Sequence, residues 1–169
     1  KAAADALIAG PRKGVYGPFL PLLRSPVLLE RVASVGEYLR FDSVLDARIR
    51  ELVTCASARH VSNQFEWHMH APLAIKAGVN PGAIEALRVG ARPQGLATDE
   101  QAALDLADEL MRTHGVSDPT WQAALAAFDE QGVVELTTLV GYFVIVSWLM
   151  NAAHTPAGAQ GAPLEPFPQ

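Results

Sequence analysis

Residues 51–70 read ELVTCASARHVSNQFEWHMH, and this stretch decides the fold. It contains three of the five histidines, the only cysteine and two carboxylates. One straight helix would place Glu51 and His70 about 28 Å apart, at about 1.5 Å per residue. A shared site therefore requires a break, and Asn63 followed by Glu66 predicts one because the pair fits the start of a capped helix. We expect a helical hairpin that turns just before Asn63 and brings Glu51 toward His70.

Length and composition indicate a single folded domain. The chain has 169 residues, half of them hydrophobic, which is enough to bury a sizeable core. We expect one all-helical domain over residues 1–154, followed by an irregular tail over residues 155–169 that is rich in proline and glycine. The net charge of −5 and the dispersed lysines and arginines leave no basic patch, so we expect no nucleic-acid partner.

The single cysteine limits the chemistry and suggests a location. Cys55 has no partner for an intramolecular disulfide, which suits a reducing cytoplasm. The histidines show no recognised metal-ligand spacing, so we expect neither a metal nor a cofactor. The longest apolar run, residues 136–150, is shorter than the ~20 residues that a bilayer span needs. We therefore predict a buried or interface helix there and no membrane partner.

Helix caps and apolar spacing predict the remaining elements. Residues 19–23 are expected to form an apolar loop over the core or over a partner subunit. Pro72 predicts a kink or an early stop just after His70, and Gly132 is expected to separate two C-terminal helices. No segment has the alternating pattern of a strand, so the expected fold class is all-α. The expected helices cover residues 1–9, 26–40, 43–60, 63–77, 81–87, 98–114, 118–128 and 133–152.

A characteristic spacing links seven positions in the hairpin and just after it: Glu51, Phe65, Glu66, Trp67, His70, Ala74 and Gly78. This spacing resembles the carboxymuconolactone decarboxylase family, which shares its fold with the alkylhydroperoxidase D enzymes. The resemblance covers roughly residues 15–155, and its most specific part is the segment FEWxxH. In the peroxidase branch two cysteines would stand at Asn63 and Glu66, and both are absent here. The resemblance therefore carries over Glu51 and His70 but not disulfide chemistry.

The resemblance implies a helical bundle that assembles as a trimer or hexamer. It implies a lyase or related enzyme that acts on a small oxygenated carboxylate or lactone by cofactor-free decarboxylation, isomerisation or another proton transfer. Loss of carbon dioxide leaves an enolate-like carbanion, so such a site needs a proton donor and a cation for a substrate carboxylate. The candidate catalytic residues are Glu51, Glu66 and His70. The candidate substrate-binding residues are Phe19, Arg48, Arg59, Asn63 and Trp67.

Each candidate also has a purely structural interpretation. Glu66 fits a capping box without any catalytic role, and His70 fits a hydrogen-bonded core histidine. Glu51 fits a surface ion pair with Arg48, three residues earlier, and Cys55 fits a small core residue. Two other functions stay open. One is peroxide reduction of the alkylhydroperoxidase type, and the other is a non-catalytic helical oligomer that binds a small molecule.

Overall fold

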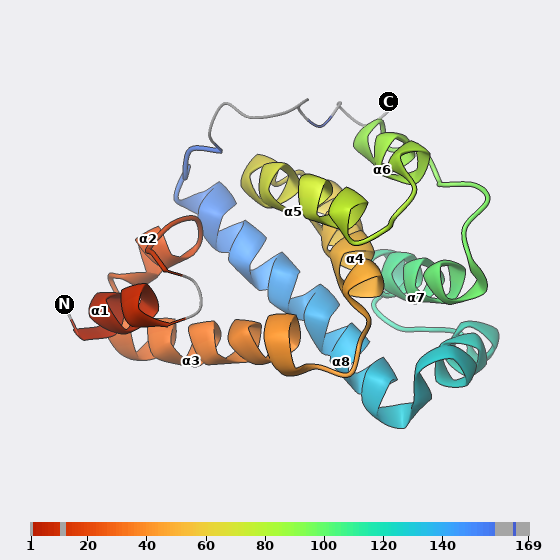
Figure 1. Ribbon diagram of the computed structural model, residues 1–169, viewed down its shortest axis with the longest axis horizontal. Helices are drawn as coiled ribbons and strands as arrows, with labels where there is room; N and C mark the ends of the chain where they lie inside the picture. Colours follow the sequence, from red (N-terminus) through yellow and green to blue (C-terminus); the bar gives the residue numbers. More distant parts are fainter. Residues whose placement is uncertain (1, 11–12, 158–163, 165–169) are drawn as a thin grey trace.

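The computed structural model describes residues 2–10, 13–157 and 164 of the chain (Figure 1). These residues form helices and connecting loops with no strand among them, which confirms the all-α prediction. The predicted tail lies mostly outside the described residues. The elements are α1 (Ala2–Ala9), α2 (Phe19–Leu22), α3 (Pro26–Glu37), the π-helix η1 (Tyr38–Asp42), α4 (Ala47–His60), α5 (Gln64–Lys76), α6 (Pro81–Arg88), α7 (Thr98–Thr113) and α8 (Asp118–Ala152).

Helices α4 and α5 form the expected hairpin. Asp46 begins α4 by accepting a hydrogen bond from the backbone N–H of Arg48 at 2.8 Å. Ser62 turns the chain with a φ of 52°, and Asn63 begins α5 by accepting from the N–H of Glu66 at 2.8 Å. The two helices then lie side by side, as Figure 1 shows. The turn is therefore set by local cap residues.

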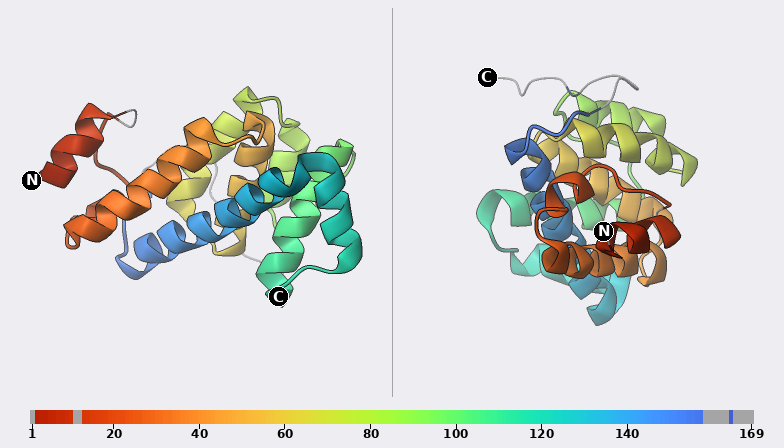
Figure 2. Two further views of the ribbon diagram at one scale, coloured as in Figure 1. Left: turned by 90° about the horizontal axis from the view of Figure 1, so that it is seen from below. Right: turned by 90° about the vertical axis from the view of Figure 1, so that its left-hand side faces the viewer.

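Three hydrophobic clusters hold the helices together. The first joins α8 to α4 and α7, and the second joins α4 to α5 and α6. The third joins α1, α2 and α3, which Figure 2 shows at one end of the molecule. Representative buried members are Ile49, Leu106 and Leu136 in the first cluster, Leu52, Cys55 and Val79 in the second, and Phe19, Leu22 and Leu29 in the third.

Helix α8 contains a break that lies elsewhere than predicted. Asp129 has a φ of 56° and a ψ of 178°, so the helical path is interrupted there and not at Gly132. Gly132 is buried, and a Cβ added to it would lie 2.7 Å from the Cβ of Phe128. This glycine therefore permits close packing across the break instead of ending a helix. By length and composition α8 could cross a membrane, but more than half of its most apolar stretch is buried, as in a core helix.

Other elements also differ from the sequence prediction. The segment predicted as a loop contains the short helix α2, whose Phe19 is buried. Helix α4 begins later than predicted because Asp46 caps it. Helix α5 continues through Pro72, since the burial of Trp67 and Ala74 on either side outweighs the lost backbone hydrogen bond. Helix α3 passes into the π-helix η1, which apolar spacing alone does not reveal.

Glu135 of α8 holds both ends of η1. Its Oε1 accepts a hydrogen bond from the hydroxyl of Tyr38 at 2.5 Å, and its Oε2 accepts from the N–H of Val44 at 2.8 Å. The N–H of Ser43 donates to the carbonyl of Tyr38 at 3.0 Å, which is the i to i+5 bond of a π-helix. Burial raises the pKa of Glu135, but the hydrogen bonds outweigh it and leave the pKa below its ordinary value. A charged carboxylate therefore fixes this turn.

Gly17→Ala should destabilise the protein, because Gly17 has a φ of 57° and an added Cβ would overlap the ring of Phe65. Gly95→Ala is the matched control, since Gly95 has a φ of 68° but nothing within 4 Å of an added Cβ. We expect Gly17→Ala to lose about 1–3 kcal/mol more unfolding free energy than the control, measured by denaturant titration. Equal losses in the two variants would show that the contact with Phe65 is unimportant.

Candidate active site

His70 lies between two carboxylates. Its Nδ1 is 2.6 Å from Oε2 of Glu51, and its Nε2 is 3.2 Å from Oε2 of Glu66. No more than 14% of any of these three side chains is exposed. The structure therefore brings together the three residues named above as catalytic candidates, and we refer to Glu51, His70 and Glu66 as the triad.

Local structure explains how the triad forms. Glu66 and His70 are four residues apart on α5 and so share one face, and the hairpin brings Glu51 across from α4. The predicted capping box is not completed, because the N–H of Asn63 donates to a carbonyl of α4 at 2.8 Å. The carboxylate of Glu66 turns to His70 instead. Glu51 likewise pairs with His70 and not with Arg48, so the surface ion pair considered above is not formed.

The two carboxylates keep His70 charged. Burial lowers the pKa of the imidazole, but hydrogen bonds to Glu51 and Glu66 and the charges of both carboxylates outweigh this effect and raise the pKa to about 9. His70 is therefore an imidazolium at neutral pH, with an N–H on each ring nitrogen. With both carboxylates ionised, the triad holds two negative charges and one positive charge.

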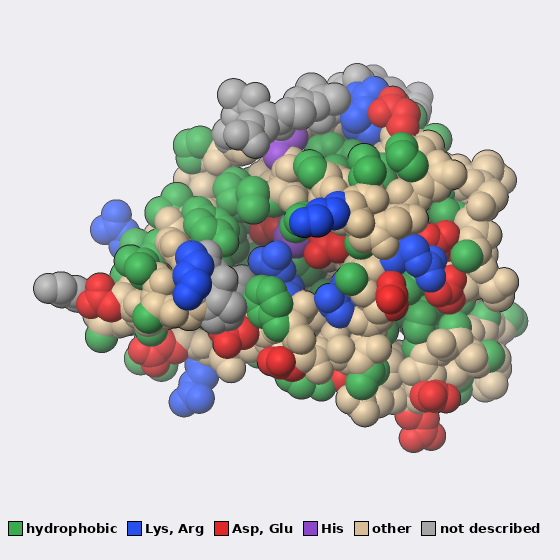
Figure 3. Space-filling view, viewed as in Figure 1, with side chains coloured by type: hydrophobic (Ala, Val, Ile, Leu, Met, Phe, Trp, Pro, Cys, Tyr) green, Lys and Arg blue, Asp and Glu red, His purple; other side chains and the backbone are tan. Residues whose placement is uncertain are grey.

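Glu66 and His70 face a small cavity walled by aromatic rings. Its volume is about 30 Å³, which is room for about two water molecules. Glu51 is not part of the lining and lies behind His70. On the face of the molecule that Figure 3 shows, histidine, acidic and basic side chains lie close together near the middle, bordered by apolar side chains. The aromatic lining residues are Tyr16, Phe19, Phe65, Tyr142 and Phe143.

Cys55 lies one helical turn after Glu51 but does not line this cavity. It is fully buried in the cluster of α4, α5 and α6. Burial and the charge of Glu51 raise the pKa of its thiol well above the ordinary value. The nucleophilic thiolate is therefore disfavoured. This placement does not suit peroxide reduction, which needs an accessible thiolate and a resolving thiol.

The structure places Phe19 in the cavity wall but corrects the roles predicted for two arginines. Arg48 forms ion pairs with Asp99 at 2.5 Å and with Glu100 at 2.8 Å, and so fastens α4 to the start of α7. Arg59 is buried beside a separate cavity of about 200 Å³ that is lined from α4, α6 and α7. Neither guanidinium lines the cavity that holds His70.

The substrate-binding roles predicted for Asn63 and Trp67 also differ from what the structure shows. The Oδ1 of Asn63 caps α5, and its Nδ2 donates to the carbonyl of Ser147 at 3.2 Å and to Oδ1 of Asn151 at 2.8 Å. This amide is therefore already engaged within the protein. Trp67 is buried in the cluster of α4, α5 and α6. Both residues hold the scaffold together and do not line the cavity.

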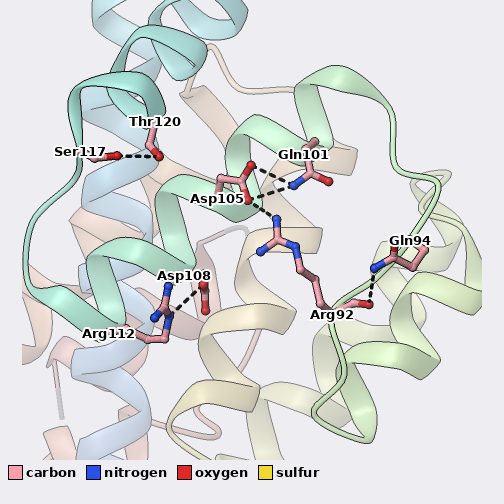
Figure 4. A network of polar contacts seen from close by, with 8 residues as sticks. All are labelled: Arg92, Gln94, Gln101, Asp105, Asp108, Arg112, Ser117 and Thr120. Atoms are coloured by element: carbon pink, nitrogen blue, oxygen red, sulfur yellow. Dashed lines mark hydrogen bonds and ion pairs between the residues drawn. The ribbon is translucent and has the colours of Figure 1, made fainter.

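The separate cavity is bordered by a network of polar contacts along α7 (Figure 4). Arg92 pairs with Asp105, and Gln101 donates to the two oxygens of Asp105 at 3.0 and 2.9 Å. Arg112 pairs with Asp108 at 3.0 Å. These exposed groups engage one another and so secure α7. Within the described ranges, no three His, Cys, Asp or Glu side chains are grouped to hold a metal.

Arg40 is the lining residue with a charged side chain that the sequence prediction missed. It reaches the cavity from η1, at the end of the expected helix 26–40. The π-helical turn that carries it depends on the bond from Tyr38 to Glu135, which lie 97 residues apart in sequence. No local pattern shows such a contact, so the sequence alone contained no signal for this position.

The protein should lose stability as pH rises toward 10, because folding raises the pKa of His70 from about 6.5 to about 9. The contribution is complete below pH 6.5 and disappears as the pH passes through about 9; it amounts to about 3 kcal/mol, at about 1.4 kcal/mol per pH unit. Unfolding free energies measured by denaturant titration should show this slope, and His70→Gln should remove it. His60→Gln should keep it, because the pKa of His60 is lowered, mainly by burial. A slope that survives in His70→Gln would contradict the assignment.

Comparison with known proteins agrees with this fold. The model of the carboxymuconolactone decarboxylase family matches residues 26–109. A peroxidase-related protein from Silicibacter sp. is 14% identical, with a TM-score of 0.67 over 78% of this chain and 70% of that chain. A protein of unknown function from Agrobacterium tumefaciens, described as an antioxidant defence protein AhpD, is 18% identical, with a TM-score of 0.65 over 83% of this chain and 96% of that chain.

A third solved structure is the debrominase Bmp8 in complex with 2,3,4-tribromopyrrole. It is 10% identical, with a TM-score of 0.72 over 94% of this chain and 85% of that chain. At these identities the three structures show a common fold and no more. No curated protein matches the sequence. Residues 26–109 thus match the carboxymuconolactone decarboxylase family, and the shared architecture shows an alkylhydroperoxidase D-like fold.

Proposed function

We propose that this protein is an enzyme that transfers a proton to or from a small oxygenated carboxylate or lactone, with His70 as the acid or base. The observation that carries the proposal is an imidazolium held between two carboxylates and facing a small cavity walled by aromatic rings. A purely structural core histidine needs neither the second carboxylate nor the cavity. Perturbed titratable groups with a specific charge partner in a cleft are typical of catalytic sites.

The geometry suggests separate roles for the two ring nitrogens. The short contact from Nδ1 to Glu51, at 2.6 Å, holds the ring and keeps it protonated. The contact from Nε2 to Glu66 is longer, at 3.2 Å, and lies at the cavity. Nε2 is therefore the nitrogen that exchanges a proton with substrate. Between turnovers Glu66 stays in contact with this nitrogen and orients it. Glu51 acts behind the ring, as an orienting carboxylate does in other histidine sites.

The decarboxylation that we propose needs no oxidant, because the electron pair of the broken bond stays on the substrate. The bond between the substrate carboxylate and its neighbouring carbon breaks, carbon dioxide leaves, and the electron pair remains on that carbon as an enolate-like carbanion. The N–H at Nε2 of His70 then protonates the carbon, and solvent returns the proton to the imidazole. Isomerisation uses the same nitrogen twice, first as an acid that protonates one carbon and then as a base that removes a proton from another. Both reactions need a low-dielectric cavity, which the aromatic walls supply.

His70→Gln and Glu51→Gln should each lower turnover by ~10²-fold or more, the usual scale for a general acid or base. The assay is a screen of small lactone acids and unsaturated carboxylates that follows carbon dioxide release and proton exchange. The rate profile should be bell-shaped, with limbs that belong to the coupled triad. Glu66→Gln should lower turnover less than the other two, because an amide can still contact Nε2.

Cys55→Ala is the control for these variants, and it should keep turnover because Cys55 does not line the cavity. Unchanged turnover in both Glu51→Gln and His70→Gln would mean that the triad serves only the fold. Loss of activity in a folded Cys55→Ala variant, together with thiol-dependent peroxide reduction, would favour the peroxidase function instead.

We also propose that the protein assembles as a homo-oligomer through α8, as a trimer or hexamer. In the apolar segment considered above as a partner surface, Phe19 and Leu22 are buried within the chain, whereas Leu20 and Leu23 stay exposed. A largely apolar stripe on α8 is also exposed, with the alternating spacing of four and three that suits helix packing. A Cβ added at Gly141 would meet nothing within 4 Å, so another helix can approach closely there. The stripe consists of Val134, Thr138, Gly141, Ile145 and Trp148.

Light scattering at micromolar concentration should return a multiple of the 18.1 kDa chain mass. Ile145→Glu should shift the protein to the monomer, because it places a charge in the middle of the stripe. Ile75→Glu is the control, since Ile75 is similarly exposed but lies on α5. A wild-type mass of 18.1 kDa would exclude the oligomer, and equal effects of both variants would exclude this surface.

A further inference from the structure

The guanidinium of Arg40 lies at the edge of the His70 cavity and forms no ion pair with a described residue. Arg40 lines this cavity and is partly exposed. Among the described residues no carboxylate pairs with it, and its guanidinium carbon lies 5.3 Å from the centre of the neighbouring Phe41 ring. Arg48 and Arg112, by contrast, each meet a carboxylate. Arg40 is therefore available to a ligand that enters the cavity.

The backbone that presents Arg40 is held on both sides. Tyr38 and Val44 bind the two oxygens of Glu135, at 2.5 and 2.8 Å, and Ser43 donates its hydroxyl to the carbonyl of Leu39 at 3.0 Å. Arg40 lies inside this clamped turn. A π-helical turn is rare and is found often at functional sites. The guanidinium therefore projects from a positioned support and not from a free loop.

The charges of the cavity favour an anionic ligand only if Arg40 takes part. Glu66 and His70 are the other acidic or basic residues in the lining, and Glu51 lies directly behind His70. The triad alone bears one more negative charge than positive, which would repel a carboxylate. Arg40 balances that excess, and its planar fork of N–H groups matches the two oxygens of a carboxylate.

We propose that Arg40 binds a carboxylate that stays on the substrate throughout the reaction, and that the substrate is a small, flat, unsaturated acid. This inference rests on the function proposed above and specifies its substrate. A carboxylate that leaves as carbon dioxide loses its charge, so a cation that held it would stabilise the ground state more than the transition state. The retained carboxylate therefore points to Arg40 and the reacting carbon to Nε2 of His70.

The aromatic walls set the shape of this substrate. Five rings enclose the cavity, and the ring of Phe143 meets His70 edge-on with centroids 5.0 Å apart. Flat unsaturated molecules pack well between such rings, whereas the walls offer few polar groups to a sugar or a phosphate. The present volume of about 30 Å³ is too small for any such acid. Binding of such an acid therefore requires the side chains that line the cavity to move apart.

Benzoate and benzamide are suitable probes, because they share shape and differ in charge. Calorimetry should show that benzoate binds wild-type protein more tightly than benzamide does. Arg40→Met should weaken benzoate binding by about tenfold or more, the scale of a charge-assisted hydrogen bond, and leave benzamide binding unchanged. Arg31→Met on α3 is the matched control and should bind benzoate as wild type does, since Arg31 is exposed and does not line the cavity. Benzoate should also shift the imidazole NMR signals of His70.

Three results would overturn the proposal. They are no benzoate binding up to about 10 mM, equal binding of benzoate and benzamide, and unchanged benzoate binding in Arg40→Met. Once a substrate is found, Arg40→Met should raise KM by about tenfold or more, whereas His70→Gln should lower kcat. An unchanged KM in Arg40→Met with a normal loss in His70→Gln would reject the anchor and keep the proton transfer. Benzoate binding through Arg40 in a protein that shows no turnover would keep the anchor and reject the proton transfer.

Discussion

The contact between Nδ1 of His70 and Oε2 of Glu51 is the interaction on which the rest of the site depends. It joins α4 to α5 at 2.6 Å and exists only because the chain turns back after His60. Ser62 makes that turn, and Asn63, which caps α5, is held to α8 through Ser147 and Asn151. Loss of the imidazolium would leave two buried carboxylates without a partner. An uncompensated buried charge is strongly destabilising, much more so than the loss of an exposed ion pair.

Burial of three ionisable groups is not explained by stability alone. A buried ion pair roughly balances its desolvation cost, and apolar side chains of similar volume often stabilise a core as well or better. Here the charged groups are arranged in an order, with Glu51 behind the ring and Glu66 at the cavity. The same burial that makes the charges costly strengthens the electric fields that the proposed proton transfer needs.

The aromatic cavity and the π-helix connect this triad to the remaining parts of the fold. Helix α8 contributes Phe143 to the wall and Glu135 to the clamp on η1, so one helix positions both sides of the cavity. Helix α2 contributes Phe19 to the wall of the cavity. The hairpin supplies the reactive groups, and the surrounding helices decide the size, polarity and charge of the space that these groups face.

The sequence by itself determined the helical class and the hairpin that brings Glu51 toward His70, because caps and apolar spacing act between residues close in the chain. Where the sequence prediction of helix ends was wrong, the error was only a few residues, as for the break at Asp129 that was predicted at Gly132. Only the tertiary structure decided which arginine faces the cavity. Arg48 is taken by Asp99, 51 residues away, and Arg40 is presented by a turn that Glu135 holds. A side chain's partner is chosen by packing between distant helices, and such contacts leave no periodic trace in the sequence.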